Sequence, residues 1–158
     1  MEFRNIAVHD HAKIISVVNE WSGGRDMVCM LPRLFFVHFC DTSFIVEENG
    51  ELAGFLFGFV SQSTPEEAYV HFAGVNPNYR KQGIGVDLYS RFISVVQYRG
   101  CKVVRCITSP TNKASIAFHK RIGFEILNGD KEVDGIPVTA NYDSNGGDRV
   151  IFHREIGN

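Results

Sequence analysis

Three apolar segments in the middle of the chain constrain its fold more than any other feature. Residues 44–48 and 52–60 are joined through Asn49-Gly50, and Asn-Gly between two apolar runs is the strongest short-range signal of a β-hairpin. A polar turn then leads into a third apolar run, residues 68–75. The pattern therefore predicts three consecutive antiparallel strands.

Helical and extended patterns surround these strands. Residues 3–8 predict a strand, and apolar spacing predicts a helix over 14–21, closed by Gly23-Gly24, and another over 33–39. Beyond residue 75 the patterns predict two helices, ending at Gly100 and Gly123, and strands at 103–107, 124–127 and 149–156. We predict an α/β fold of the mixed α+β type, with a central, mixed, mostly antiparallel sheet of about seven strands and helices on both faces.

Length and charge narrow the function classes. A chain of 158 residues is long enough for one ordinary domain, so we expect a single domain over 1–158. The formal charge of −2, without a basic block, argues against extended nucleic-acid binding. The longest apolar runs are far shorter than the ~20 residues of a membrane span, and the start lacks a secretion-signal pattern, so we expect no membrane partner and a cytoplasmic protein.

Cysteine and histidine spacings favour neither a metal site nor a disulfide framework. The four cysteines make no CxxC pair, and His9 and His11 have no third ligand nearby in the sequence. We therefore expect no metal and reduced thiols. The stretch 129–148, rich in Gly, Asn and Asp, is long for a connection, and we predict a functional or mobile loop there.

The segment Pro77-Asn78-Tyr79-Arg80-Lys81-Gln82-Gly83-Ile84-Gly85 lies between a predicted strand and a predicted helix. Backbone N–H groups at a helix N-terminus are unpaired and can hold a pyrophosphate, and Gly83 and Gly85 keep that approach free of side chains. A tight strand-to-helix connection explains the same glycines equally well. The dinucleotide fingerprint does not fit, because Leu88 stands where its third glycine is required.

Two motifs in order resemble those of one family. The run Arg80-Lys81-Gln82-Gly83-Ile84-Gly85 is similar to the R/Q-x-x-G-x-G/A acetyl-CoA motif of the GNAT N-acetyltransferase superfamily. Downstream, the segment from Asn112 to Phe124 resembles that family's later motif, an Asn that opens a helix ending in Gly-Phe. The resemblance covers residues 44–127 and implies a GNAT-like fold and an acetyl-CoA-dependent N-acetyltransferase.

The resemblance also implies where acetyl-CoA, as co-substrate, would bind. In this family the strand before the phosphate turn is splayed from its neighbour and its backbone binds pantetheine, which here implies Gly74 and Val75. The resemblance assigns the pyrophosphate and pantetheine contacts to Arg80, Lys81, Gln82, Gly83, Ile84, Gly85, Val86, Asn112 and Ser115. Phe118, which is apolar at helical spacing, is expected in the core more than at the cofactor.

The implied reaction is direct attack of a primary amine on the thioester. An alkylamine with a pKa near ~10.4 is almost entirely protonated at pH 7, so a proton acceptor is useful. His71 lies close to the position where many members carry a Glu base, and histidine can accept a proton at neutral pH. The sequence supports equally well a structural role for His71, as a histidine hydrogen-bonded within the sheet.

His119 stands where many members carry a Tyr that protonates the leaving thiolate. Asn112, Ser115 and His119 share one predicted helix face, so His119 can be that acid, or a residue that only contacts the cofactor or solvent. For the amine pocket, family likeness points to the two ends of the chain, whose candidates are Trp21, Arg25, Asp26, Tyr142, Asp143 and Asp148. The alternative is that these residues lie in solvated loops and that Trp21 lies in the core.

The amine acceptor itself is not identified by these motifs. We expect a small-molecule or peptide amine. An acyl-CoA-binding sensor without catalysis and a protein-modifying acetyltransferase are alternatives. A homodimer is expected if the final strand lies at an open sheet edge.

Overall fold

The computed structural model describes residues 1–157, so Asn158, the last residue of the predicted domain, lies outside them. Strands β2 (Phe44–Glu48), β3 (Glu51–Val60) and β4 (Glu67–Val75) form the predicted antiparallel meander. Asn49 and Gly50 both have positive φ, 52° and 80°, as a two-residue hairpin turn of type I′ requires. The prediction of three consecutive strands is confirmed.

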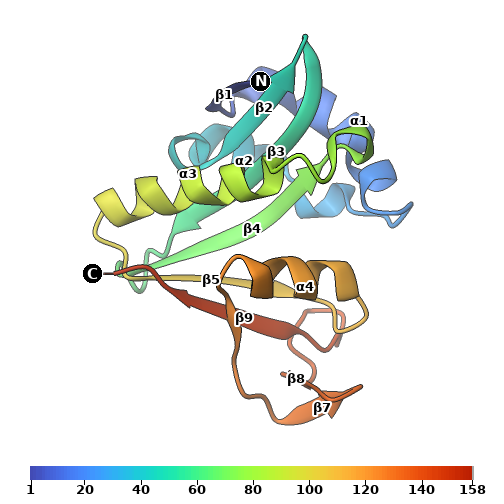
Figure 1. Cartoon of the computed structure of the whole chain (residues 1–158), viewed down its shortest axis with the longest axis vertical. Helices are drawn as coiled ribbons and strands as arrows, with labels where there is room; N and C mark the ends of the chain where they lie inside the picture. The colour runs from blue at the N-terminus through green and yellow to red at the C-terminus, as the bar shows by residue number, and fades with distance from the viewer. Residues whose placement is uncertain (158) are drawn as a thin grey trace.

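The meander belongs to a seven-stranded sheet whose strand order is β1-β2-β3-β4-β5-β9-β6 (Figure 1). The other strands are β1 (Glu2–Asn5), β5 (Val103–Thr108), β6 (Glu125–Ile126) and β9 (Val150–Glu155). Neighbours are antiparallel except β4 and β5, which are parallel. The predicted mixed, mostly antiparallel sheet is confirmed. However, β9 lies between β5 and β6, so the open-edge argument for a homodimer does not apply.

Helices cover both faces of the sheet. One buried hydrophobic cluster contains residues of α1 (His11–Trp21) and α2 (Arg33–His38). The other contains residues of α3 (Ile84–Tyr98) and α4 (Lys113–Arg121). Figure 1 shows α3 and α4 in front of the strands. Short 3₁₀ helices are η1 (Val8–Asp10), η2 (Val28–Met30), η3 (Cys40–Thr42) and η4 (Pro77–Tyr79). The helix α3 packs so closely on β3 that a Cβ at Gly58 would lie 2.3 Å from the Phe92 ring.

The first strand is shorter than predicted. It ends at Asn5, and η1 begins at Val8 instead of extending the strand there. The buried carboxylate of Asp10 accepts a hydrogen bond from the Ala7 backbone N–H (2.8 Å) and pairs with Arg4 (2.7 Å). These two contacts turn the chain, because they hold residue 10 back against residues 4–7.

The stretch 129–148 contains structure that the sequence analysis missed. Strands β7 (Lys131–Val133) and β8 (Ile136–Val138) pair as a hairpin around Asp134-Gly135, which both have positive φ. Asp-Gly at a two-residue turn is a recognised hairpin signal, and the three-residue strands that flank it are too short to show alternation. Residues 131–138 of the predicted functional or mobile loop therefore form a hairpin that the sequence analysis did not predict.

Within residues 1–157, none of the helices combines the length and apolarity that a bilayer crossing requires. In the same residues, no three or more His, Cys, Asp or Glu side chains are grouped closely enough to hold a metal ion.

Candidate active site

Strands β4 and β5 separate partway along their length. Their pairing runs from Glu67↔Val103 to Tyr69↔Arg105 and ends there. Beyond Tyr69, β5 continues to Thr108 along β9, while β4 continues to Val75 along β3. The β5-facing edge of β4 over residues 70–75, roughly 17 Å of strand, therefore has no strand partner. Unpaired backbone N–H and C=O groups at such an edge can bind an extended ligand.

The turn that follows β4 presents free amides. Gly83 is the N-cap of α3 with φ 87°, and Lys81 also has a positive φ of 64°. The first backbone hydrogen bond that closes α3 runs from the Asp87 N–H to the Gly83 carbonyl (3.0 Å). The amides of residues 84–86 precede that bond and belong to the unpaired first turn of a 15-residue helix. This turn can therefore hold a pyrophosphate at the end of the open β4 edge.

The basic side chains of the turn have different settings. The Arg80 guanidinium donates to the carbonyls of Trp21 (2.9 Å) and Val75 (3.3 Å), so Arg80 ties the turn to the end of α1. Arg80, Lys81 and Gln82 are all exposed. Arg80 and Lys81 therefore both add positive charge at the mouth of the turn.

Glycines at this junction make room for close packing. A Cβ at Gly74 would lie 2.7 Å from the Phe55 ring, and one at Gly85 would lie 3.2 Å from the Phe118 ring and 3.8 Å from Val75. The N-terminus of α3, the side of α4 and the end of β4 thus meet at Gly85. Phe118 is half-buried and fills this junction, which agrees with its predicted core position.

His71 occupies a β-bulge. Phe57 pairs with Phe72 and Gly58 pairs with Val70, so His71 is an extra residue of β4 with no partner in β3. Bulges re-aim side chains and are over-represented beside active sites. Here the His71 ring points to the α1–α2 face, where it stacks on Phe35 with ring centroids 4.2 Å apart.

The hydrogen bond of His71 sets its tautomer. Its Nε2 lies 2.5 Å from the Met30 carbonyl oxygen, which can only accept, so Nε2 carries the proton. In the neutral ring Nδ1 is then the free acceptor. Burial lowers the pKa of His71, and the Met30 hydrogen bond opposes that shift more weakly. His71 is therefore held neutral at pH 7 and can accept a proton at Nδ1.

The N-terminus of α4 bears two of the predicted ligands. Asn112 is the N-cap, and its side-chain oxygen accepts from the Ser115 N–H at 3.1 Å. This capping leaves the two N–H donors of the Asn112 amide unused. The predicted shared face of Asn112, Ser115 and His119 holds in part, because the Ser115 hydroxyl lies 3.2 Å from His119 Nδ1.

His119 itself is turned into the core. It is 7% exposed and stacks on Phe152 with ring centroids 4.5 Å apart. Its Nδ1–H donates to the Ser115 carbonyl (2.8 Å), and Nε2 accepts from the Tyr89 hydroxyl (2.8 Å). Both ring nitrogens are thus occupied within the protein. This setting favours a structural role, and the catalytic role of His119 stays a prediction.

Acid destabilisation tests the buried setting of His119. Burial lowers the pKa of both His119 and His71, so the folded state binds fewer protons than the unfolded chain once the pH falls below the ordinary histidine pKa of about 6.5. Their contribution to stability is complete above that pH and is lost as the pH falls. The slope is at most about 1.4 kcal/mol per pH unit for each histidine.

Replacing His119 with Phe is expected to reduce this slope between pH 6.5 and 5, and the part contributed by His71 should remain. The measurement is urea unfolding at several pH values. A variant with the wild-type slope would place His119 in water and contradict the structure.

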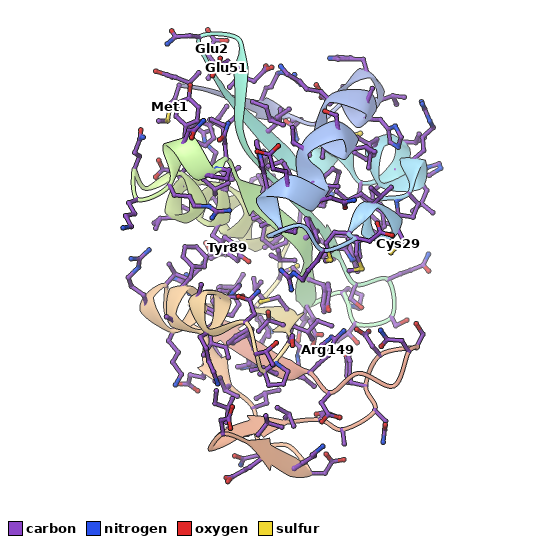
Figure 2. All side chains as sticks on the ribbon, turned by 90° about the vertical axis from the view of Figure 1, so that its right-hand side faces the viewer. Met1, Glu2, Cys29, Glu51, Tyr89 and Arg149 are labelled. Atoms are coloured by element: carbon purple, nitrogen blue, oxygen red, sulfur yellow. The ribbon has the colours of Figure 1, made fainter. Side chains whose placement is uncertain are left out.

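The candidate residues for the amine pocket, from the two ends of the chain, lie in different environments. Trp21 is half-buried and stacks on Phe55 (5.8 Å), and Arg25 donates to the Ser22 carbonyl. Asp143 is paired with Arg149 (2.6 Å) and Asp148 with Lys131 (2.7 Å). The remaining two, Asp26 and Tyr142, are exposed. Figure 2 shows Cys29 of η2 and Arg149 toward one side of the molecule and Tyr89 toward the other.

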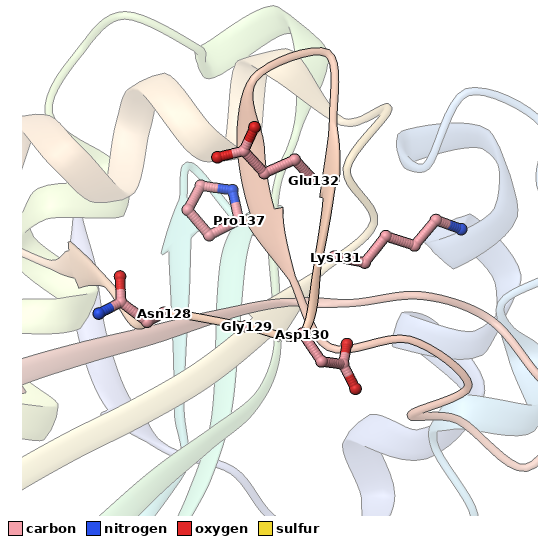
Figure 3. A pocket seen from close by; sticks show the side chains of 6 residues that line it. All are labelled: Asn128, Gly129, Asp130, Lys131, Glu132 and Pro137. Carbon is pink, nitrogen blue, oxygen red and sulfur yellow. The ribbon is translucent and has the colours of Figure 1, made fainter.

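A shallow cavity of about 390 Å³ lies elsewhere, at the base of the β7–β8 hairpin (Figure 3). Its lining residues are Asn128, Gly129, Asp130, Lys131, Glu132 and Pro137. All six come from the segment that follows β6, and none from β4 or the turn before α3. This cavity is therefore not the candidate site.

Two features of the site escaped the sequence analysis. The bulge at His71 depends on how β3 and β4 pair, and no local sequence pattern indicates it. The role of Tyr89 as hydrogen-bond partner of His119 requires α3 and α4 to pack together. Tyr89 does follow the apolar Leu88 on α3, which places it near the buried face.

Comparisons with known proteins agree with this geometry. The family model described as Acetyltransferase (GNAT) family matches residues 13–124. An uncharacterized N-acetyltransferase of Methanocaldococcus jannaschii is 35% identical over 89 residues, 54% of this chain and 39% of that protein. The [ribosomal protein bS18]-alanine N-acetyltransferase of Escherichia coli K12 is 29% identical over 82 residues, 52% of this chain and 53% of that protein. The chain thus spans between about two fifths and one half of these relatives.

The fold has solved counterparts. The diaminobutyrate acetyltransferase of Paenibacillus lautus, solved with L-2,4-diaminobutyric acid and coenzyme A, superposes with a TM-score of 0.72 over 99% of this chain and 96% of that one, at 20% identity. An identity this low shows the fold alone. The family model, in contrast, covers well over half of the sequence, including the open β4 edge and the phosphate turn. The chain therefore belongs to the acetyltransferase (GNAT) family.

Proposed function

We propose that this protein is an acetyl-CoA-dependent N-acetyltransferase that acetylates a primary amine by direct attack. The observation that carries the proposal is the junction of an unpaired β4 edge with a helix N-terminus whose amides are free. An extended pantetheine arm fits the edge, and a pyrophosphate fits the amides. The similarity to named N-acetyltransferases supports the same reaction.

Different residues of the site would bind different parts of acetyl-CoA. The backbone of Gly74 and Val75 would contact pantetheine, and the amides from Gln82 to Val86 would hold the pyrophosphate. Lys81 would add charge at the mouth, and Arg80 would hold the turn in place through its carbonyl contacts. Asn112 and Ser115 would face the pantetheine arm from the start of α4.

Acetyl-CoA would supply an activated acyl group as a thioester. The amine nitrogen forms a bond to the thioester carbonyl carbon, the carbon–sulfur bond breaks, and CoA leaves as a thiolate. The ammonium first gives one proton to a base and becomes nucleophilic, and the nitrogen loses a second proton as the amide forms, which the leaving thiolate can take up to give free CoA. His71 Nδ1 is the free acceptor on the α1–α2 face, so we assign His71 as the general base. His119 is assigned a supporting role, since it holds α3 against α4 through Tyr89.

We propose a single domain over residues 1–158 and a cytoplasmic location. The free thiols, with Cys101 and Cys106 buried, support a reducing, cytoplasmic setting. No homodimer is proposed, because the sequence argument required the final strand at an open sheet edge and β9 lies between β5 and β6.

Transfer is tested by CoA release and product mass. The protein, acetyl-CoA and a panel of primary amines and peptide N-termini are combined, and an acetylated product 42 Da heavier than the amine, from the exchange of one hydrogen for an acetyl group, is expected with CoA release above the rate of the amine-free control. Acetyl-CoA binding without any product would favour a non-catalytic sensor. Product formed only on proteins would favour a protein-modifying enzyme.

A further inference from the structure

Half-buried aromatic side chains line the α1–α2 face beside His71. Phe72 stacks on the fully buried Phe55 with ring centroids 6.0 Å apart, and Trp21 stacks on Phe55 at 5.8 Å. Phe35 covers the His71 ring. Unlike Phe55, the rings of Trp21, Phe35 and Phe72 are partly open to solvent. A molecule that reaches His71 from this face therefore meets aromatic surface.

The aromatic surface continues toward the segment before β9. Tyr69, two residues from His71, stacks on Phe59 with ring centroids 5.6 Å apart. Burial raises the pKa of Tyr69, and the neighbouring Tyr142, Cys106 and Asp143 raise it further. The Tyr142 side chain is 46% exposed. It extends the surface without contributing to the core.

Three of the carboxylates around this surface are paired with basic side chains. Glu67 lies 3.0 Å from Arg105, Asp143 lies 2.6 Å from Arg149, and Asp148 lies 2.7 Å from Lys131. Glu20 and Asp26 are exposed, where water and salt screen their charge. A second positive charge on a substrate would thus lose hydration here and gain at most an exposed, solvent-screened carboxylate.

The approach to the site fixes which face the acceptor uses. The phosphate turn leads into α3, on the opposite face of the sheet from α1 and α2. His71 points to the α1–α2 face. An amine that is to give its proton to His71 must therefore lie on the α1–α2 face, against the aromatic surface.

We propose that the acceptor is a monocationic primary amine attached to an aromatic or large apolar group, and that diamines and polyamines are poor acceptors. This inference rests on the proposed function. Rings of the acceptor would pack against Phe72, Trp21 and Tyr142, and aromatic pairs gain more than their buried area alone provides. Its single ammonium can lie over a ring face before deprotonation.

Calorimetric binding to the protein–CoA complex tests the preference without requiring turnover. The matched probes are 2-phenylethylamine, n-butylamine and 1,4-diaminobutane, which separate the effect of a ring from that of a second charge. The dissociation constant of 2-phenylethylamine is expected to be at least about tenfold lower than that of n-butylamine, about one 1.4 kcal/mol step. That of 1,4-diaminobutane should be no lower than that of n-butylamine. A preference for the diamine, equal affinities of 2-phenylethylamine and n-butylamine, or no binding of any amine would each overturn the inference.

Two peptide amides, one that begins with Phe and one that begins with Ala, distinguish a polypeptide N-terminus from a small molecule as the acceptor. Tighter binding of the Phe peptide than of 2-phenylethylamine would assign the acceptor to a polypeptide N-terminus, and the reverse order to a small molecule. CoA release measured with the same amines keeps the two proposals apart. Release with the diamine preferred would overturn the acceptor preference and retain transfer, whereas the predicted binding order without release would retain the preference and remove transfer.

Two exposed tyrosines provide a matched pair of variants. Tyr142→Ala is expected to reduce the ratio of 2-phenylethylamine to n-butylamine affinity at least about threefold. Tyr98→Ala, at the far end of α3 with 95% exposure, should leave that ratio unchanged. Neither substitution removes a buried side chain, so both variants should fold. An unchanged ratio in Tyr142→Ala would remove Tyr142 from the acceptor surface.

Discussion

Replacing His71 with Ala is expected to lower kcat/KM for the amine by about 10²- to 10⁴-fold, the usual contribution of a general base. The reason is that Nδ1 of His71 is the free acceptor on the face from which the amine must approach, while Nε2 is fixed on the Met30 carbonyl. The measurement is CoA release under matched conditions. Acetyl-CoA affinity should stay within about twofold, because His71 lies on the other face from the phosphate turn.

His71→Gln separates catalysis from structure. A glutamine amide can still donate to the Met30 carbonyl, but it cannot take up a proton near neutral pH. Turnover should therefore be lost in this variant as well, with stability closer to wild type. The wild-type pH profile should lose activity as the pH falls through the lowered pKa of His71, below about 6.5, and this acid limb should be absent from the Gln variant. Full activity in His71→Gln would remove His71 from the mechanism.

A second large effect is expected at the phosphate turn. Gly83→Asp places a carboxylate at the N-cap of α3, where the pyrophosphate would bind, and is expected to weaken acetyl-CoA binding by on the order of 100-fold, about 2.7 kcal/mol. Gly83 has φ 87°, so any side chain there also adds backbone strain.

Gly100→Asp is the matched control for this variant. Gly100 lies just past the other end of α3, with φ 91° and no atom within 4 Å of an added Cβ, the same conditions as at Gly83. It therefore adds the same charge and a similar strain away from the site. Equal acetyl-CoA affinity in the two variants would show that the loss at Gly83 comes from strain and not from the anion site.

Local patterns predicted most of the fold. The Asn49-Gly50 turn defined the meander, and the spacing of apolar residues on α3 together with its terminal Gly100 defined the helix after the phosphate turn. The β7–β8 hairpin was missed because strands of three residues carry too little alternation to be seen. The end of β1 was misplaced because the Arg4–Asp10 contact, which turns the chain, is a tertiary feature.

The candidate site was predictable where backbone alone defines it. Glycines and helix N-termini can be read from sequence, so the turn between β4 and α3 was located correctly, and pyrophosphate binding there stays a prediction. Side-chain direction was harder to predict. A bulge turned His71 toward the α1–α2 face, and packing against Phe152 and Tyr89 turned His119 into the core. The ion pairs of the acidic residues could not be predicted from sequence either, because Asp143 and Asp148 have partners 6 and 17 residues away in the chain.

Thermal unfolding with and without acetyl-CoA tests the central claim most directly. At a ligand concentration about 100 times Kd, binding should stabilise the folded state by about 2.7 kcal/mol and raise Tm by roughly 5 to 11 °C. The account predicts a shift of this size in wild type and in Gly100→Asp, and a much smaller one in Gly83→Asp. An unchanged Tm in wild type would mean that the turn before α3 is only a tight connection, and would contradict the proposed function.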